Sequence, residues 1–187
     1  MNKEQFIEKL ECWIKQDLIN MLGIKAINNC GGCNFPIVLY ILTSMEWIGF
    51  IARDCNCTKS QRDATHENIG ECLKYFNNPK YANKHIKNII IKIFRHGLVH
   101  QFGPKAAGIS RGNCLEFAIY TYNDLPVIDA DLFASDFIEA IDNCIEKVVQ
   151  DDKFFNRVKE KLNYLFAEDK KDLYKLADEI NTSDKNK

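Results

Sequence analysis

The sequence predicts a mainly α fold, a helical bundle with a small β-hairpin insertion. Apolar residues recur at steps of three and four over most of the 187 residues, and one aromatic and β-branched segment, Leu115–Tyr122, breaks that period. The chain is 46% hydrophobic and 27% charged and has no repeat or linker, which is typical of one globular domain. We therefore predict a single domain over residues 1–180 and a disordered, charged tail over residues 181–187.

The first part of the chain predicts two helices joined by a loop. In Lys3–Leu22 the apolar residues fall on one face, as in an amphipathic helix. A loop is expected over Gly23–Gly32, where glycine and asparagine gather. Asn34 can then cap a helix that has Pro36 in its first turn and runs to about Arg53. Because this helix is apolar on nearly all sides, we expect it at the centre of the bundle.

The middle of the chain predicts two more helices and then the hairpin. Thr65–Phe76 fits a short helix, and Tyr81 to about Val99 fits a longer one with a buried isoleucine stripe. The hairpin is expected to pair Ile109–Arg111 with Leu115–Tyr122, and Val127-Ile128 is a candidate for a further strand.

Helical spacing returns in the last part of the chain. Apolar residues fill one face over Phe133–Val149, and a further helix is expected over Phe154–Phe166. The sequence after Asp172 is charged, and we expect Asn181–Lys187 to be disordered.

The N-terminal composition and the cysteines predict a cytoplasmic protein. Met1–Asp17 mixes charged and apolar residues, so we expect neither a secretory signal nor a transit peptide. The longest apolar run, Phe35–Ile51, contains Glu46 and is short for a membrane span, so we expect a buried helix and no membrane contact. Eight cysteines in such a chain are expected to be reduced thiols rather than a disulfide framework.

Two cysteine pairs suggest a zinc site but are badly placed for one. Cys30 and Cys33 form a CxxC, and Cys55 and Cys57 form a CxC. A predicted helix of about 20 residues, roughly 30 Å long, separates the two pairs. The CxxC also lacks the βαβ context of a redox motif. We therefore expect no metal and no cofactor.

The formal net charge of −1 hides a basic stretch. No Asp or Glu lies between Cys72 and Leu115, a window that holds three of the four histidines. Its basic residues are Lys74, Lys80, Lys84, Lys87, Lys92, Arg95, Lys105 and Arg111. The window either forms a surface that attracts phosphate or packs against the acidic segment Asp124–Asp152, which would cancel its field. The pI of about 6.4 argues against tight non-specific nucleic-acid binding.

The basic stretch contains the short motif Arg95-His96-Gly97-Leu98-Val99-His100. Its guanidinium stays charged, whereas an imidazole titrates near neutral pH. Together these groups can hold a phosphate and move a proton without a metal. The alternative is an Arg and two His at the end of an ordinary helix. His96 and His100 could share a metal, but no Asp, Glu or Cys lies nearby in the sequence to complete such a site.

The spacing of the motif constrains how its residues can meet. Five residues of regular α-helix rotate by about 500°, so positions 95 and 100 lie roughly 140° apart around the axis. The two side chains converge only if the helix unwinds near Gly97 or if Arg and His from two chains meet across a dimer axis.

The motif, late in a helix of an all-α domain, resembles that of the HEPN superfamily. The upstream Gly31-Gly32 and Phe35-Pro36-Ile37-Val38-Leu39, which lead into an apolar helix with Glu46, add to this resemblance to uncharacterised bacterial HEPN-like proteins. The resemblance implies a helical bundle that pairs as a homodimer. It also implies either a metal-independent endoribonuclease, often a toxin or defence component with an antitoxin-like protein partner, or a non-catalytic module that binds a nucleotide, RNA or a protein.

If the resemblance carries activity, it implies roles for individual residues. His100 would act as general base or acid on RNA, and Arg95 would bind the scissile phosphate. His96 would orient or support that chemistry. Candidate phosphate contacts at the rim are Lys92, Lys105 and Arg111. Glu46 is either an ordinary hydrogen-bonded carboxylate or a buried one that orients Arg95 or His100.

Overall fold

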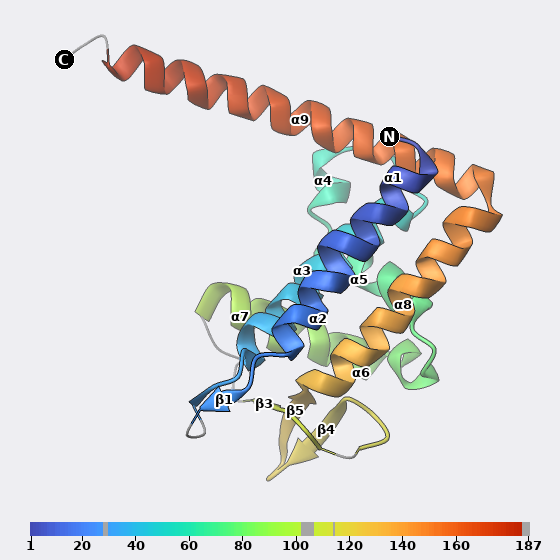
Figure 1. Ribbon diagram of the computed structural model, residues 1–187, viewed down its shortest axis with the longest axis vertical. Helices are drawn as coiled ribbons and strands as arrows, with labels where there is room; N and C mark the ends of the chain where they lie inside the picture. The colour runs from blue at the N-terminus through green and yellow to red at the C-terminus, as the bar shows by residue number, and fades with distance from the viewer. Residues whose placement is uncertain (28–29, 102–106, 114, 185–187) are drawn as a thin grey trace.

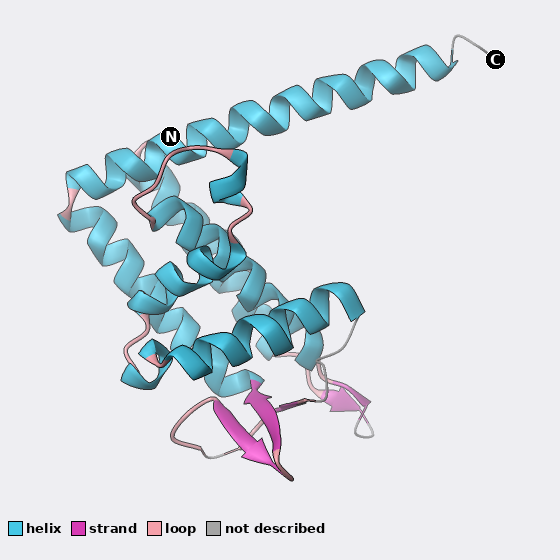
Figure 2. Cartoon of the chain, turned by 180° about the vertical axis from the view of Figure 1, so that it is seen from behind, coloured by secondary structure: helices cyan, strands magenta, loops and turns pink. Residues whose placement is uncertain are grey.

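The computed structural model describes residues 1–27, 30–101, 107–113 and 115–184. Side chains are described for these residues except 26–27, 30–31, 99–101, 172 and 178–184. The fold is mainly α, as predicted, with helices packed side by side and a few short strands at one end (Figures 1 and 2). The last helix crosses the opposite end of the bundle and continues past it (Figure 1).

The chain begins with one continuous helical run, which confirms the prediction for Lys3–Leu22. Its segments are α1 (Lys3–Glu8), the π-helical η1 (Lys9–Lys15) and α2 (Gln16–Leu22). Asn2 starts it with a capping box, because its side chain accepts from the amide of Gln5 while its own amide donates to the Gln5 side chain. The predicted loop after it contains a two-residue antiparallel ladder, β1 (Ala26–Ile27) with β2 (Cys30–Gly31).

The central helix is α3 (Asn34–Ala52), and it is buried as predicted. Its cap differs from the prediction: Cys33, with a φ of 61°, occupies the N-cap, so Asn34 is the first helical residue. Among the described residues α3 alone is long and apolar enough to span a membrane, yet 56% of it lies buried inside the fold. Gly49 permits close packing, because a Cβ there would lie 1.7 Å from the carbonyl oxygen of Asn68.

A series of short helices follows and ends in the motif. They are α4 (Lys59–Arg62), α5 (Thr65–Cys72), η2 (Leu73–Tyr75), η3 (Pro79–Ala82), α6 (Lys84–Asn88), the π-helical η4 (Ile89–Arg95) and α7 (His96–Gln101). The expected helices over Thr65–Phe76 and Tyr81–Val99 are thus present in segmented form. The helix does not unwind near Gly97, because the backbone stays helical through Gln101. Burial of Gly97 and Leu98 against the bundle accounts for this continuity.

The small sheet has three strands in the order β3 (Gly108–Ser110), β5 (Leu125–Asp129) and β4 (Ile119–Tyr122). The predicted pairing of Ile109–Arg111 with Leu115–Tyr122 is wrong. β4 pairs antiparallel with β5, while β3 pairs parallel with β5. The buried Asp129 carboxylate draws β3 to β5, because it accepts hydrogen bonds from the side chains of Ser110 (3.2 Å) and Asn113 (2.9 Å).

The chain ends in two long helices, α8 (Ala130–Gln150) and α9 (Asp152–Asp184). α8 confirms the prediction, and α9 runs far beyond the predicted end at Phe166. Residues 181–184 are helical rather than part of a disordered tail, and 185–187 lie outside the described residues. The second half of α9 projects from the bundle (Figure 2). Charged residues favour helix there, so the helix persists without a core to pack against.

Candidate functional site

The motif arginine lies at the junction of η4 and α7, and its guanidinium contacts α3. Arg95 donates from Nη2 (2.7 Å) and Nε (3.0 Å) to the same oxygen, Oε2, of Glu46. The two side chains are 16% and 17% exposed. An ion pair with so little solvent access is poorly screened and fixes the position of both groups.

Glu46 also connects the motif to a third element. Its other oxygen, Oε1, accepts a short hydrogen bond from the hydroxyl of Thr65, the first residue of α5. The carboxylate therefore joins α3, the motif helix and α5 in one polar cluster. Of the two alternatives for Glu46, the structure shows a largely buried carboxylate that contacts Arg95. The Thr65 contribution was missed, because a threonine at a helix start looks like an ordinary capping residue.

A pocket of about 280 Å³ lies beside this cluster. Its lining residues are Thr43, Glu46, Trp47, Phe50, Arg62, Asp63, Arg95 and Leu165. Arg62 and Asp63 pair with each other at 3.0 Å. The Nη1 group of Arg95 makes no hydrogen bond to any described residue, so this nitrogen can still donate to a ligand. The pocket therefore combines an aromatic wall with a guanidinium whose orientation is fixed.

The backbone of the motif keeps positions 95 and 100 apart. η4 ends at Arg95, and residues 96–101 form regular α-helix, so the two positions lie about 140° apart around the axis. Unwinding of the helix end, one of the two routes to convergence, is therefore absent from this fold. The side chain of His100 lies outside the described part of the structure. His96 is half-buried.

The proposed rim residues have different surroundings. Arg111 is fully engaged, because its Nε pairs with Asp131 (2.7 Å) and its Nη atoms donate to the carbonyl oxygens of Leu22 (2.8 Å), Ile24 (3.0 Å) and Gly32. These bonds tie the end of α2 and the following loop to α8. Arg111 is thus a structural residue, and its assignment to a phosphate-binding rim is not supported by this geometry.

The other two rim candidates differ from Arg111. Lys92 is exposed on η4, and Lys105 lies outside the described residues.

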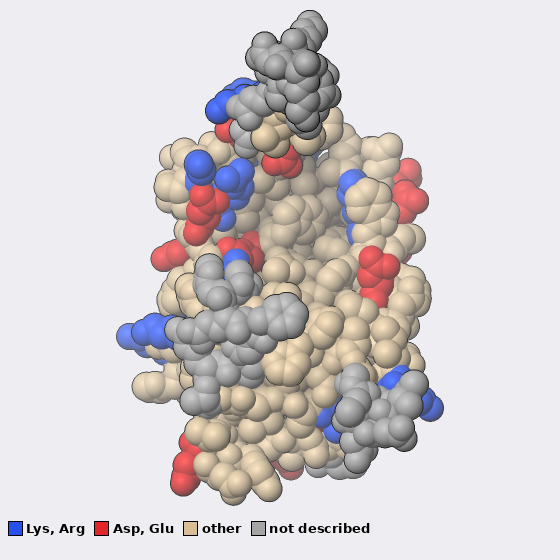
Figure 3. Space-filling view, turned by 90° about the vertical axis from the view of Figure 1, so that its left-hand side faces the viewer, with Lys and Arg blue, Asp and Glu red and all other residues tan. Residues whose placement is uncertain are grey.

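The acidic segment neutralises part of the basic stretch. Arg111 pairs with Asp131 of α8, as the interpretation of cancelling fields expects. On the side of the molecule seen in Figure 3, Lys and Arg form small separate groups among uncharged atoms. This side of the molecule therefore gives no support to a broad nucleic-acid-binding face.

The cysteine pairs remain separated, as the helix between them predicts. The 19 residues of α3 place Cys33 and Cys55 at opposite ends of a helix about 28 Å long. Within residues 1–27, 30–101, 107–113 and 115–184, no three His, Cys, Asp or Glu side chains cluster closely enough to hold a metal ion.

Comparison of the chain with protein-family models, with curated proteins and with solved structures finds no match.

Proposed function

We propose that this protein is a metal-independent endoribonuclease of the HEPN type, with a site completed by two copies of the chain. The observation that supports it best is the fixed orientation of Arg95. Glu46, whose other oxygen accepts from Thr65, accepts hydrogen bonds from two nitrogens of the guanidinium. The third nitrogen, Nη1, is then the one to donate to a phosphate oxygen. A cation positioned before the substrate arrives stabilises charge that develops on the phosphate without reorganisation.

The proposed reaction is transfer of a phosphoryl group within RNA. His100 removes the proton of a ribose 2′-OH, whose oxygen attacks the adjacent phosphorus. The bond from phosphorus to the 5′-oxygen breaks, and that oxygen takes up a proton. The products are a 2′,3′-cyclic phosphate and a free 5′-hydroxyl. Arg95 binds the phosphate oxygens, and His96 orients or supports His100.

A second copy of the chain follows from the backbone of the motif. Positions 95 and 100 diverge on one regular helix, so Arg95 of one protomer and His100 of its partner are the pair expected to meet. We propose a homodimer in the cytoplasm, with a role in toxin–antitoxin or defence systems and an antitoxin-like protein as a partner. Lys92 and Lys105 remain candidates for contacts to the RNA backbone.

A non-catalytic module that binds a nucleotide, RNA or a protein is the second candidate. The ion pair between Arg95 and Glu46 also favours this candidate, because Glu46 neutralises the charge of Arg95 before any phosphate arrives. The scattered basic groups in Figure 3 agree with this alternative.

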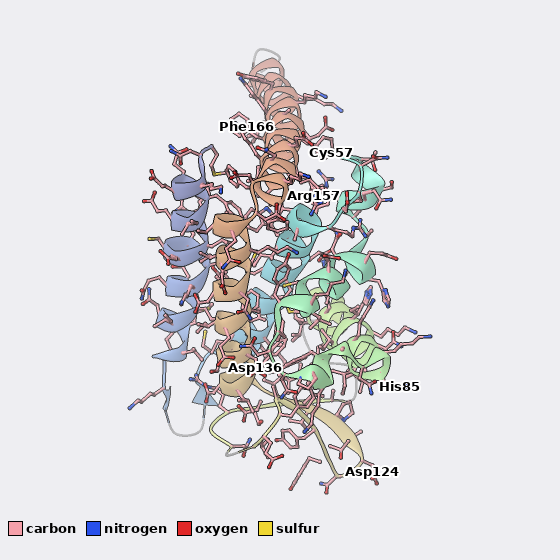
Figure 4. All side chains as sticks on the ribbon, turned by 90° about the vertical axis from the view of Figure 1, so that its right-hand side faces the viewer. Cys57, His85, Asp124, Asp136, Arg157 and Phe166 are labelled. Atoms are coloured by element: carbon pink, nitrogen blue, oxygen red, sulfur yellow. The ribbon has the colours of Figure 1, made fainter. Side chains whose placement is uncertain are left out.

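A cleavage assay on mixed RNA in EDTA separates the two candidates. We expect the wild type to release cyclic phosphates and His100→Ala to lose about 10²–10⁴-fold in rate. His85→Ala is the matched control, because His85 lies exposed on α6 of the same basic stretch (Figure 4) and should leave cleavage unchanged. Light scattering establishes the oligomeric state of each variant.

Three results would contradict the ribonuclease. The first is absence of cleavage by a folded dimer, and the second is cleavage that His100→Ala leaves unchanged. The third is cleavage by a protein that stays a strict monomer, since the proposed site needs two copies of the chain. RNA binding without cleavage would support the binding module instead.

A further inference from the structure

A buried lysine of α9 lies where α3 ends. Lys161 is 2% exposed, and its ammonium donates to the carbonyl oxygens of Phe50 (2.8 Å) and Arg53. The last carbonyls of a helix have no partners within it. Lys161 supplies a donor to the Phe50 carbonyl and adds a second donor to the Arg53 carbonyl, which also accepts from the backbone amide of Cys55 (3.1 Å). The third donor of the ammonium points to sulfur, because Nζ lies 3.1 Å from Sγ of Cys55.

The charge of Lys161 has no carboxylate partner in the described part of the chain. Among the described side chains, none of the Asp and Glu residues forms an ion pair with this ammonium. A buried cation is stable when an opposite charge or several dipoles compensate it. The two carbonyls supply dipoles, and the Cys55 sulfur is the remaining group in contact that is able to carry a negative charge.

A second cation contacts the same sulfur. Arg53 donates from Nε to Sγ of Cys55 at 3.4 Å, and its Nη2 is held by the carbonyl (2.9 Å) and the side-chain oxygen (2.6 Å) of Gln61. Cys55 therefore accepts hydrogen bonds from a guanidinium and an ammonium at once. Adjacent cations stabilise a thiolate, which is the nucleophilic form of cysteine.

This sulfur is within reach of small reagents. Cys55 and Cys57 are half-buried and line a pocket of about 550 Å³ together with Asp54, Asn56, Gln61, Arg157, Glu160 and Lys161. Figure 4 shows Cys57 and Arg157 at the same end of the molecule, where α9 begins. Burial raises the pKa of the Cys57 thiol, so this second cysteine holds its proton more firmly than a free thiol does. Residues two apart also lie within about 7 Å at Cα, close enough for a disulfide.

We propose that Cys55 is a nucleophilic thiolate that reacts with hydroperoxides, and that Cys57 then closes a Cys55–Cys57 disulfide. The Cys55 sulfur attacks one peroxide oxygen and breaks the O–O bond, giving a sulfenic acid and an alkoxide or hydroxide, which takes a proton from water. The Cys57 thiol next attacks the sulfenic sulfur, an S–S bond forms, and water leaves with the thiol proton. The peroxide is reduced by two electrons and the two cysteines are oxidised.

Oxidation has a consequence for the fold. A disulfide sulfur carries no charge, so Lys161 would keep only the two carbonyls as partners. The oxidised chain should therefore hold α9 less firmly against the end of α3. This inference is independent of the proposed ribonuclease, because Arg95 and His100 take no part in it.

The test compares alkylation rates of individual cysteines in the folded full-length chain. Cys12 is the internal reference, because it is exposed on η1 and so is more accessible than Cys55. With iodoacetamide near pH 6.5, peptide mapping should show Cys55 modified about tenfold faster than Cys12. Lys161→Gln and, separately, Arg53→Gln should bring the Cys55 rate down toward that of Cys12. A Cys55 that reacts no faster than Cys12 in the wild type would overturn the proposal, whether or not either variant folds.

The second step is tested with hydrogen peroxide. The wild type should lose the mass of two hydrogens and yield a Cys55–Cys57 linked peptide, which a dithiol reductant reverses. Cys57→Ser should stop at a Cys55 sulfenic acid that dimedone traps. Oxidation that begins at Cys12, or that leaves Cys57 reduced in the wild type, would contradict the pair.

Discussion

Two buried cations pack against α3, and they are compensated in different ways. Arg95 forms an ion pair with the carboxylate of Glu46, near the middle of the helix, and this carboxylate neutralises its charge. Lys161 meets the end of the same helix, where two carbonyl oxygens and a thiol replace a carboxylate. The first arrangement fixes geometry and leaves one donor for a ligand. In the second arrangement no described carboxylate compensates the charge of Lys161, and Cys55, a side chain that can react, is the contacting group able to become negative.

The largest effect is expected from removing the cation at the end of α3. Lys161→Met keeps the aliphatic packing but removes the ammonium donor from the Phe50 carbonyl and leaves the Arg53 carbonyl with the Cys55 amide alone. We expect the free energy of unfolding to fall by about 3 kcal/mol, measured by urea denaturation. Lys159→Met is the matched control, because Lys159 is exposed two residues earlier and should change stability by less than about 0.5 kcal/mol. Equal effects of the two substitutions would show that the carbonyl contacts do not stabilise the fold.

The ion pair in the middle of α3 should cost somewhat less to break. Glu46→Leu leaves Arg95 largely buried without its carboxylate and should lower the free energy of unfolding by about 2 kcal/mol. The double variant Glu46→Leu/Arg95→Met removes both charges and should recover part of that loss. A double-mutant cycle in urea should give a coupling energy of about 1–2 kcal/mol. A coupling near zero would mean that the two side chains do not depend on each other.

The difference between the two cations also shows what the sequence could predict. Glu46 stood out as a lone carboxylate in an apolar helix, and an inward-facing carboxylate needs a cation. Contact with Arg95 or His100 of the basic motif was therefore one of the open alternatives for Glu46, and the fold was needed to select Arg95. Lys161 gave no such signal, because a lysine in a helix rich in lysine and glutamate reads as solvent-exposed. Lys161 is buried only because α9 crosses the end of α3, and that crossing depends on tertiary packing rather than on local sequence.

The strand segments and the last helix were predicted, but the pairing of the strands and the length of that helix were not. Helix positions followed from apolar spacing, which local sequence encodes. The partner of β4 depended on the turn at Asn123-Asp124, where φ values of 48° and 61° suit a two-residue hairpin that joins β4 directly to β5. The parallel addition of β3 depends on Asp129, whose buried carboxylate is visible only once the fold is known. The projecting part of α9 lacks an apolar core contact, so periodicity could not reveal it.

A half-buried carboxylate that pairs with no cation among the described residues tests the comparison through pH. Asp136 on α8 accepts a hydrogen bond from the hydroxyl of Tyr81 at 2.6 Å, and burial raises the pKa of its carboxyl. The folded state then keeps this proton to higher pH than the unfolded state. The free energy of unfolding therefore falls as pH rises from about 4 through the raised pKa, and above that pKa this group causes no further change. Asp136→Asn should remove that dependence, seen as a smaller loss of stability between pH 4 and pH 7 in urea. An unchanged pH profile would mean that the carboxyl titrates alike in both states.

The smallest effect is expected at a site where no charge is buried, the tip of the β4–β5 hairpin. Asn123 and Asp124 are exposed and both adopt left-handed backbone, which glycine enters without a steric penalty. Asp124→Gly should raise the free energy of unfolding by about 0.5 kcal/mol, whereas Asn123→Ala should lower it by about 1 kcal/mol. Neither change should alter the alkylation rate of Cys55, because the hairpin lies at the opposite end of the bundle from the start of α9 (Figure 4). If both substitutions destabilise the protein, the polar side chains of Asn123 and Asp124 hold the turn, rather than backbone preference. Polar contacts would then stabilise this exposed end of the fold, as the contacts of Arg95 and Lys161 stabilise the packing against α3.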